Sequence, residues 1–173
     1  MAFRLEEKIE LHISDYIKIL SLIKSNGGSE IFSERKISST YFDNKNYDMF
    51  LDSEEGCLPR KKIRIRNYPN DKITSFYLQK KISSVEGKFK KSNKISLKDN
   101  KNFLDYGIFD GEYGLCTKNI KITYTRKYFK LMNSRITLDR NILFEIPDKK
   151  IDFLENKNLI LEIKAGATIV KEI

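Results

Sequence analysis

The chain has 173 residues, of which 40% are hydrophobic and 33% are charged, and its formal net charge is +9. This length and composition predict a single globular domain over residues 1–173, with a buried core and an anionic partner. One histidine, two distant cysteines and the lack of a long apolar run argue against a zinc site, a histidine-based triad, a signal peptide and a membrane span, so we expect a cytoplasmic protein.

The first part of the chain predicts two strands and two helices. Residues 3–11 alternate apolar and charged side chains, which is typical of a strand. A helix is predicted over 14–25, because a capping Ser-Asp pair precedes apolar residues at helical spacing and Asn-Gly-Gly follows. His12 stands beside this helix and is expected to be structural. A strand is predicted over 37–43, followed by a short amphipathic helical turn at 47–51.

Residues 60–91 contain eleven Lys or Arg and only two acidic residues, an excess of cations equal to the net charge of the whole chain. Strands are predicted over 60–68 and 73–83, joined by a Tyr-Pro-Asn-Asp turn, and a further extended segment begins at Lys88. Side chains alternate along a strand, so three cations of the first strand share one face: Lys62, Arg64 and Arg66. Such a face is suited to bind an anion.

The second half of the chain predicts one helix and several further strands. Ser96 is placed to cap a helix over 97–106, and a glycine-containing loop follows. Strands are predicted over 119–130, 134–139, 141–146 and 159–164. About eight strands with two or three flanking helices predict an α+β fold, in which a mostly antiparallel sheet curls into a closed β-barrel.

Cations and carboxylates share the polar faces of several predicted strands. Examples are Arg4/Glu6/Lys8/Glu10, Arg135/Asp139 and Glu162/Lys164. Unpaired cations are costly in a dry core, so these faces form either a basic outer surface or a wet interior that holds a polyanion. The recurring acids favour the interior, because Arg and Lys bind phosphate while Mg²⁺ or Mn²⁺ takes carboxylate oxygens beside it. The sequence has no Walker or kinase motif, so side chains would hold a nucleotide.

Seven segments carry a resemblance to a known family: 4–8 (RLEEK), 39–43 (STYFD), 60–68 (RKKIRIRNY), 78–81 (LQKK), 122–126 (ITYTR), 135–139 (RITLD) and 161–164 (LEIK). In this order they resemble the VTC domain, the catalytic module of the vacuolar transporter chaperone complex, in the triphosphate tunnel metalloenzyme (CYTH-like) superfamily. The resemblance implies an eight-stranded tunnel with a basic interior that binds ATP and inorganic polyphosphate with Mn²⁺ or Mg²⁺. The activity it implies is transfer of the ATP γ-phosphoryl group onto a growing polyphosphate chain, with release of ADP.

The resemblance also implies the residues of the site. The phosphate ligands are Lys8, Arg64, Arg66, Lys81, Lys90, Arg126 and Arg135, with Lys62 beside them. The catalytic residues among them are Arg64, Arg66, Lys81, Arg126 and Arg135. Glu162 is the expected metal ligand, with Glu6 as a second one, and the expected neighbours are Lys88, Asp139 and Lys164. Tyr41 and Asp43 are expected to be structural.

Two departures from the family pattern bear on activity. Gln79 stands where the family usually has a glutamate, which removes one carboxylate that could bind metal or handle a proton. The sequence ends nine residues after Lys164, whereas relatives continue through a helix with another basic residue. We therefore expect either a naturally short protein or a domain truncated at its C-terminus.

Three classes of function fit these features. The first is an enzyme, either a polyphosphate polymerase or a triphosphatase on the same tunnel. The second is a non-catalytic module that binds polyphosphate or inositol polyphosphate, which Gln79 and the short C-terminus motivate. The third is a nucleic-acid-binding barrel; we expect no nucleic acid, because acids on the basic faces would repel its backbone. The sequence leaves open an oligomer and a membrane partner protein that receives the product.

Overall fold

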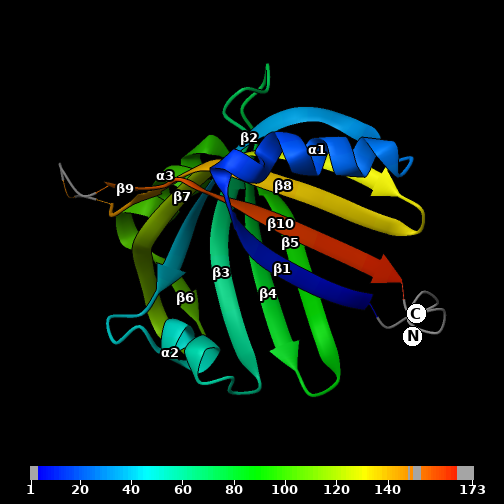
Figure 1. The fold of residues 1–173 in the computed structure, drawn as a ribbon. Helices are drawn as coiled ribbons and strands as arrows, with labels where there is room; N and C mark the ends of the chain where they lie inside the picture. The colour runs from blue at the N-terminus through cyan, green and yellow to red at the C-terminus, as the bar shows by residue number, and fades with distance from the viewer. Residues whose placement is uncertain (1–3, 148, 150–152, 167–173) are drawn as a thin grey trace. The chain divides into compact units, whose positions relative to one another are not determined.

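The computed structural model of the chain describes residues 4–147, 149 and 153–166. Over these residues it contains a 10-stranded, mostly antiparallel sheet with the hydrogen-bonded order β1-β10-β8-β7-β2-β3-β4-β5, in which β6 pairs with β7 and β9 with β8 (Figure 1). Three α-helices accompany it. None of the helices in this described part of the chain is long and apolar enough to cross a membrane.

The elements follow the chain in this order: β1 (Arg4–His12), a 3-10 turn (Ile13–Asp15), α1 (Tyr16–Ser25), β2 (Ser29–Asp43), α2 (Asp48–Glu54), β3 (Arg60–Asn67), β4 (Phe76–Ser84), β5 (Gly87–Ile95), α3 (Leu97–Tyr106), β6 (Ile108–Asp110), β7 (Gly114–Leu131), β8 (Ser134–Glu145), β9 (Phe153–Asn156) and β10 (Asn158–Gly166). They form two compact units. Unit 1 comprises Met1–Lys36, Tyr124–Leu143 and Glu155–Ile173, and unit 2 comprises Ile37–Thr123 and Phe144–Leu154.

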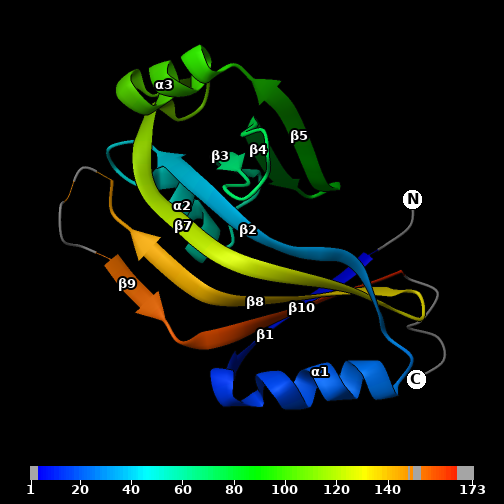
Figure 2. The ribbon, with the colours of Figure 1, turned by 90° about the horizontal axis from the view of Figure 1, so that it is seen from above.

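In unit 1, α1 covers one face of the strands β1, β8 and β10 (Figure 2). The buried apolar side chains on this face are Ile23, Phe129, Ile136, Leu138 and Leu159. Burying each of them stabilises the fold by roughly 1.5–3 kcal/mol. Because side chains alternate along a strand, the residues between them point to the opposite face, where charged groups gather.

In unit 2, β3 pairs with β2 on one side and with β4 on the other, and β5 continues beyond β4. Ile63 and Ile65 of β3 are buried in the core, as their alternation predicted. The other buried core residues are Phe42, Met49, Ile108 and Cys116, and α3 packs Phe103 and Leu104 against them. The opposite face of β3, β4 and β5 is polar.

Several predicted elements are confirmed, and others differ in length. Helix α3 has the predicted bounds, Leu97–Tyr106. Strand β2 begins at Ser29 rather than at 37. Nothing in the sequence indicated this first part of the strand, because its residues are mostly exposed and do not alternate between buried and exposed positions. The strands predicted over 134–139 and 141–146 are one strand, β8. Asn141 adopts a φ of 54° within it, a conformation that asparagine tolerates better than most residues.

The mostly antiparallel sheet with helices confirms the α+β prediction, but one part of that prediction is wrong. The strand order has two ends, β1 and β5, so over the described residues the sheet is not a barrel closed by hydrogen bonds. Strand β5 carries four lysines and is exposed along most of its length, which is typical of a strand that stays at a sheet edge. Residue 3, predicted to start the first strand, lies outside the described residues.

Candidate functional site

The structure brings the predicted site residues together in two groups, one in each unit. In unit 2 they lie on the polar face of β3, β4 and β5, which we call the cationic face: Lys62, Arg64, Arg66, Lys81 and Lys90. In unit 1 they surround what we call the carboxylate cluster: Glu6, Arg126, Asp139, Glu162 and Lys164.

The antiparallel register places lysines in a row across the cationic face. Lys62 of β3 is the Cα partner of Lys81 on β4, and Lys81 is the partner of Lys90 on β5. All three are exposed. The segments that form β3, β4 and β5 contain no Asp or Glu at all. Like charges opposite one another on neighbouring strands are destabilising, so this row favours a bound anion.

Arg64 lies beside the row and is held by uncharged groups. Its Nη1 donates to the hydroxyl of Tyr41 at 2.8 Å, and its Nε donates to Oε1 of Gln79 at 3.0 Å. The guanidinium also lies over the Tyr41 ring, 5.7 Å from the centroid. Tyr41, which we expected to be structural, therefore orients a predicted phosphate ligand. Neither partner cancels the positive charge of Arg64.

Arg66 is the most buried cation of this face, with 8% of its surface exposed. Its Nε donates to Oγ of Ser39 at 3.1 Å, across the β2–β3 pair. A buried guanidinium needs such partners, because leaving a charge unpaired in the interior is costly. Ser39 was missed in the sequence, although its alternation with Tyr41 on the predicted strand was a signal.

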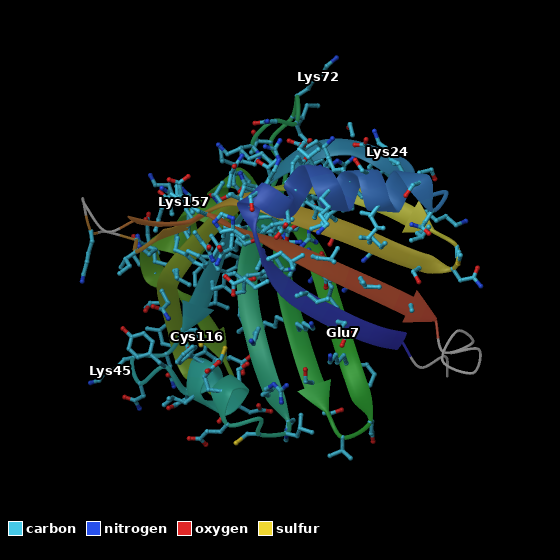
Figure 3. The ribbon with its side chains drawn as sticks, in the orientation of Figure 1. Glu7, Lys24, Lys45, Lys72, Cys116 and Lys157 are labelled. Atoms are coloured by element: carbon cyan, nitrogen blue, oxygen red, sulfur yellow. The ribbon has the colours of Figure 1, made fainter. Side chains whose placement is uncertain are left out.

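Not all cations of residues 60–91 belong to the cationic face. Lys61 and Lys80 each lie 3.0 Å from a carboxylate oxygen of Asp110, which is buried. Burial alone would raise the pKa of Asp110, but hydrogen bonds from Lys80 and Lys61 outweigh it and lower the pKa to about 2. Lys72 lies at the tip of the β3–β4 loop and points away from the strands (Figure 3). Asp110 has no signal in the sequence, because it is the last residue of a short strand, β6, that was not predicted.

The carboxylate cluster of unit 1 is a network of paired charges. Asp139 accepts two hydrogen bonds from Arg126, from Nε at 2.5 Å and from Nη2 at 2.6 Å. Nη2 also lies 3.6 Å from Oε2 of Glu162. Lys164 contacts two carboxylates through Nζ: Oε1 of Glu162 at 2.9 Å and Oε1 of Glu6 at 3.1 Å. The predicted neighbours Asp139 and Lys164 are thus part of the cluster.

Glu162 is buried and ionised within this network. Burial would raise its pKa, but hydrogen bonds with Glu6 and Lys164 and the charges of Lys164 and Arg126 lower the pKa to about 2. Oγ1 of Thr137 donates to Oε2 of Glu162 at 3.3 Å and fixes its orientation. Burial would lower the pKa of Arg126, but the hydrogen bonds to Asp139 and the charge on Glu162 raise it above its ordinary value.

The donor set of this cluster suits a divalent cation. Glu6 and Glu162 converge on the single ammonium of Lys164, so both carboxylates point toward one cationic position. Mg²⁺ and Mn²⁺ prefer oxygen ligands and are commonly held by one or two carboxylates together with substrate phosphates. Among the described residues there is no group of three or more His, Cys, Asp or Glu placed to hold a metal. A metal here would therefore depend on phosphate oxygens.

Two predicted phosphate ligands, Lys8 and Arg135, flank the carboxylate cluster. In the strand register, Lys8 is the Cα partner of Glu162, and Arg135 is the partner of Lys164. Both are exposed. Lys88, the predicted neighbour in unit 2, lies opposite Ser83 near the start of β5.

Other residues have the structural roles expected of them. Asp43 accepts hydrogen bonds from the backbone N–H groups of Met49 and Phe50, at 3.1 and 3.0 Å, and so caps α2. Nδ1 of His12 accepts from the backbone N–H of Ser14 at 3.3 Å. The two cysteines are free thiols.

Comparisons with known proteins identify the family and the fold. The family model of the VTC domain matches residues 3–121. A candidate adenylate cyclase from Bacillus halodurans is 14% identical with a TM-score of 0.64, covering 94% of this chain and 80% of that chain. A protein from Pyrococcus horikoshii is 14% identical with a TM-score of 0.56, covering 93% and 77%. A candidate adenylate cyclase from Vibrio parahaemolyticus is 13% identical with a TM-score of 0.57, covering 92% and 75%.

Identities this low show a shared fold and nothing more. A comparison with curated proteins found no match. The family model, in contrast, matches well over half of the chain and confirms the resemblance seen in the sequence. This chain belongs to the VTC domain family.

Proposed function

We propose that this chain is a metal-dependent polyphosphate polymerase that transfers the γ-phosphoryl group of ATP onto the end of an inorganic polyphosphate chain. The observations that support the proposal are an acid-free cationic strand face in unit 2 and, in unit 1, the carboxylates of Glu6 and Glu162 on either side of the Lys164 ammonium. Phosphoryl transfer needs both kinds of group, since it depends on positioning and on neutralising charge rather than on a protein nucleophile.

The cationic face binds the phosphates in this proposal. Lys62, Lys81 and Lys90 supply point charges along a row, while Arg64 and Arg66 donate hydrogen bonds to non-bridging oxygens. A terminal oxygen of the polyphosphate chain attacks Pγ of ATP, the bond from Pγ to the β,γ-bridging oxygen breaks, and ADP leaves. Cations held in place before the reaction stabilise the charge that develops on the transferred group.

Glu6 and Glu162 would hold Mn²⁺ or Mg²⁺, which when bound neutralises phosphate charge and orients the phosphates. Nε and Nη2 of Arg126 already donate hydrogen bonds to Asp139, so Arg126 would contact a phosphate oxygen through Nη1. Lys8 and Arg135 add positive charge beside the carboxylates. This division of roles gives a place to each phosphate ligand and metal ligand that the family resemblance implied.

The test is to incubate the protein with ATP and Mn²⁺ and to measure polyphosphate by gel electrophoresis together with ADP and orthophosphate. We expect one phosphoryl unit in the polymer for each ADP released, and no polymer when EDTA removes the metal. Orthophosphate without polymer would identify a triphosphatase instead. The absence of both products across pH and metal conditions would overturn the assignment as an enzyme.

A second candidate is a module that binds polyphosphate without turnover. The absence of carboxylates from β3, β4 and β5 favours it, because this face has no acid that could hold a metal or take a proton. Tight polyphosphate binding in EDTA, together with no product in the assay above, would favour this candidate.

A further inference from the structure

Gln79 lies at the middle of the cationic face and joins its strands. It is 6% exposed, and its Cα partners are Arg64 on β3 and Ser92 on β5. Its Oε1 accepts from Nε of Arg64 at 3.0 Å, and its Nε2 donates to Oγ of Ser92 at 3.1 Å. One buried amide therefore satisfies a donor on one side and an acceptor on the other.

The amide does what a carboxylate at this position could not do. A glutamate would accept from Arg64 equally well, but it would cancel the charge of the guanidinium and could not donate to Ser92. Because β3, β4 and β5 contain no other candidate acid, residue 79 decides whether the face contains a carboxylate. With Gln79, Arg64 is oriented while its positive charge stays available to an anion.

We propose that Gln79 is a positioning residue that holds the Arg64 guanidinium through a neutral hydrogen bond and thereby lets the cationic face bind a phosphate chain without a divalent metal. The inference rests on the phosphate binding proposed for this face, which the polymerase and the binding module share. In the polymerase, metal would then be required for transfer at the carboxylate cluster and not for holding the chain on β3, β4 and β5.

The opposite arrangement shows why the residue type matters. A carboxylate at position 79 would repel phosphate oxygens directly and would form an ion pair with Arg64. A phosphate chain could then be bound well only if a cation neutralised that carboxylate. Metal dependence of binding at this face is therefore set by the choice between an amide and a carboxylate.

The experiment measures binding of sodium tripolyphosphate to the full chain by isothermal titration calorimetry, at pH 7.5 and low salt, in EDTA and in Mg²⁺. Mg²⁺ also binds the ligand in solution, so the measured quantity is the ratio of the two Kd values, compared between wild type and variants. The variants are Gln79→Glu, Gln79→Ala and Ser92→Ala. Asn102→Glu is the matched control, because it also replaces an amide with a carboxylate, at an exposed position of α3, the helix that packs on the apolar side of unit 2.

Wild type is expected to bind in EDTA. Gln79→Glu should weaken binding in EDTA by about 10- to 100-fold, the range expected when a charge-assisted hydrogen bond is lost, and Mg²⁺ should restore part of the loss. Gln79→Ala should weaken binding by roughly threefold to tenfold in EDTA and in Mg²⁺ alike, because it removes orientation and adds no charge. Ser92→Ala should act in the same way with a smaller effect, and Asn102→Glu should leave the ratio unchanged.

The outcomes separate this inference from the function. If wild type binds tripolyphosphate under neither condition, phosphate binding by this face and the role of Gln79 both fail. If wild type binds only with Mg²⁺, or if Gln79→Glu binds like wild type in EDTA, the inference alone is overturned. Circular dichroism checks that each variant folds. If Gln79→Glu does not fold, wild-type-like affinity of both Gln79→Ala and Ser92→Ala would overturn the inference instead.

Discussion

Lys164 places an internal cation between two carboxylates that are candidates for metal binding. Its Nζ lies 2.9 Å from Glu162 and 3.1 Å from Glu6, so the ammonium and a divalent ion compete for the same oxygens. We expect Lys164→Gln to raise the affinity for Mn²⁺ by roughly tenfold, because it removes one opposing charge at contact distance. Titration of free Mn²⁺ by electron paramagnetic resonance measures this directly.

The control for that titration is Lys24→Gln, which removes an exposed lysine from the last turn of α1. It should leave Mn²⁺ affinity unchanged within a factor of two or so, because exposed charges far from a site are screened by salt. Equal or weaker Mn²⁺ binding by Lys164→Gln would show that the ammonium does not compete with the metal.

Asp110 gives a second prediction, on acid stability. Its folded-state pKa of about 2 lies below the ordinary value of 3.8, so its stabilisation is fully present above about pH 4 and is lost as the pH falls toward 2. Each pKa unit corresponds to about 1.4 kcal/mol, so the loss is about 2 kcal/mol. Urea unfolding at pH 2 to 6 should show this slope in wild type and a shallower one in Asp110→Asn. If the free energy of unfolding depends on pH equally in wild type and in Asp110→Asn, the loss of stability in acid cannot be assigned to Asp110.

Single residues also show what a sequence can and cannot reveal. The shared face of Lys62, Arg64 and Arg66 was predictable, because it follows from alternation alone. The pairing of Lys61 and Lys80 with Asp110 was not predictable, because it joins residues 30 and 49 positions apart through a fold that the pattern does not specify. The network of Tyr41, Arg64, Gln79 and Ser92 likewise depends on strand register.

At the scale of elements, α3 is the clearest success of prediction from sequence. Ser96 accepts from the backbone N–H of Asp99 at 3.0 Å, which satisfies one of the unpaired N–H groups of the first turn. We expect Ser96→Ala to lower the free energy of unfolding by about 1 kcal/mol, and Ser96→Asp to restore most of it, since both Ser and Asp cap helices well. Chemical denaturation measures both. An unchanged free energy of unfolding in Ser96→Ala would show that the cap is not stabilising.

The strands were harder to delimit than this helix, for a physical reason. The first eight residues of β2 are mostly exposed, so nothing in their polarity distinguishes a strand from a loop. In β8, Asn141 resembles a turn residue, yet the strand passes through it with a positive φ. Burial patterns predict strands only where one face is packed, and these segments lack such packing.

At the scale of the whole molecule, the two groups of site residues should have separable roles. Lys81→Ala is expected to weaken tripolyphosphate binding in EDTA about tenfold or more, because it removes the central lysine of a row. Glu6→Gln should leave that binding nearly intact, yet lower Mn²⁺-dependent turnover roughly 100-fold. Calorimetry and the polymer assay measure the two effects. Equal losses of binding in both variants would contradict separate roles.

Arg66→Ala is also expected to abolish turnover, but it is a less clean variant than Lys81→Ala. Arg66 is 8% exposed and bonded to Ser39, whereas Lys81 is exposed, so only the first change disturbs a buried site. Circular dichroism of both variants separates the roles. Loss of the folded signal in Lys81→Ala would mean that this lysine is structural.

The family and the α+β class could be predicted from the whole sequence, because seven short segments occur in a fixed order. The family model matches residues 3–121, which contain the first four of these segments. Closure of the sheet could not be predicted, because it depends on whether two edge strands meet. In the described chain, β5 has no hydrogen-bonded neighbour beyond β4, and its four lysines are typical of an edge strand. The alternation that predicts which side chains share a face does not predict whether the two edge strands of the sheet pair with each other.

The lack of any acidic residue in β3, β4 and β5 has a practical consequence for handling the protein. A surface of this kind acts as an anion exchanger and binds polyanions that are abundant in a cell lysate. Protein purified at low salt should therefore carry phosphate polymers, detectable as excess phosphorus, and a wash at high ionic strength should remove them. Affinities measured before such a wash would describe exchange of ligands rather than binding to the bare protein.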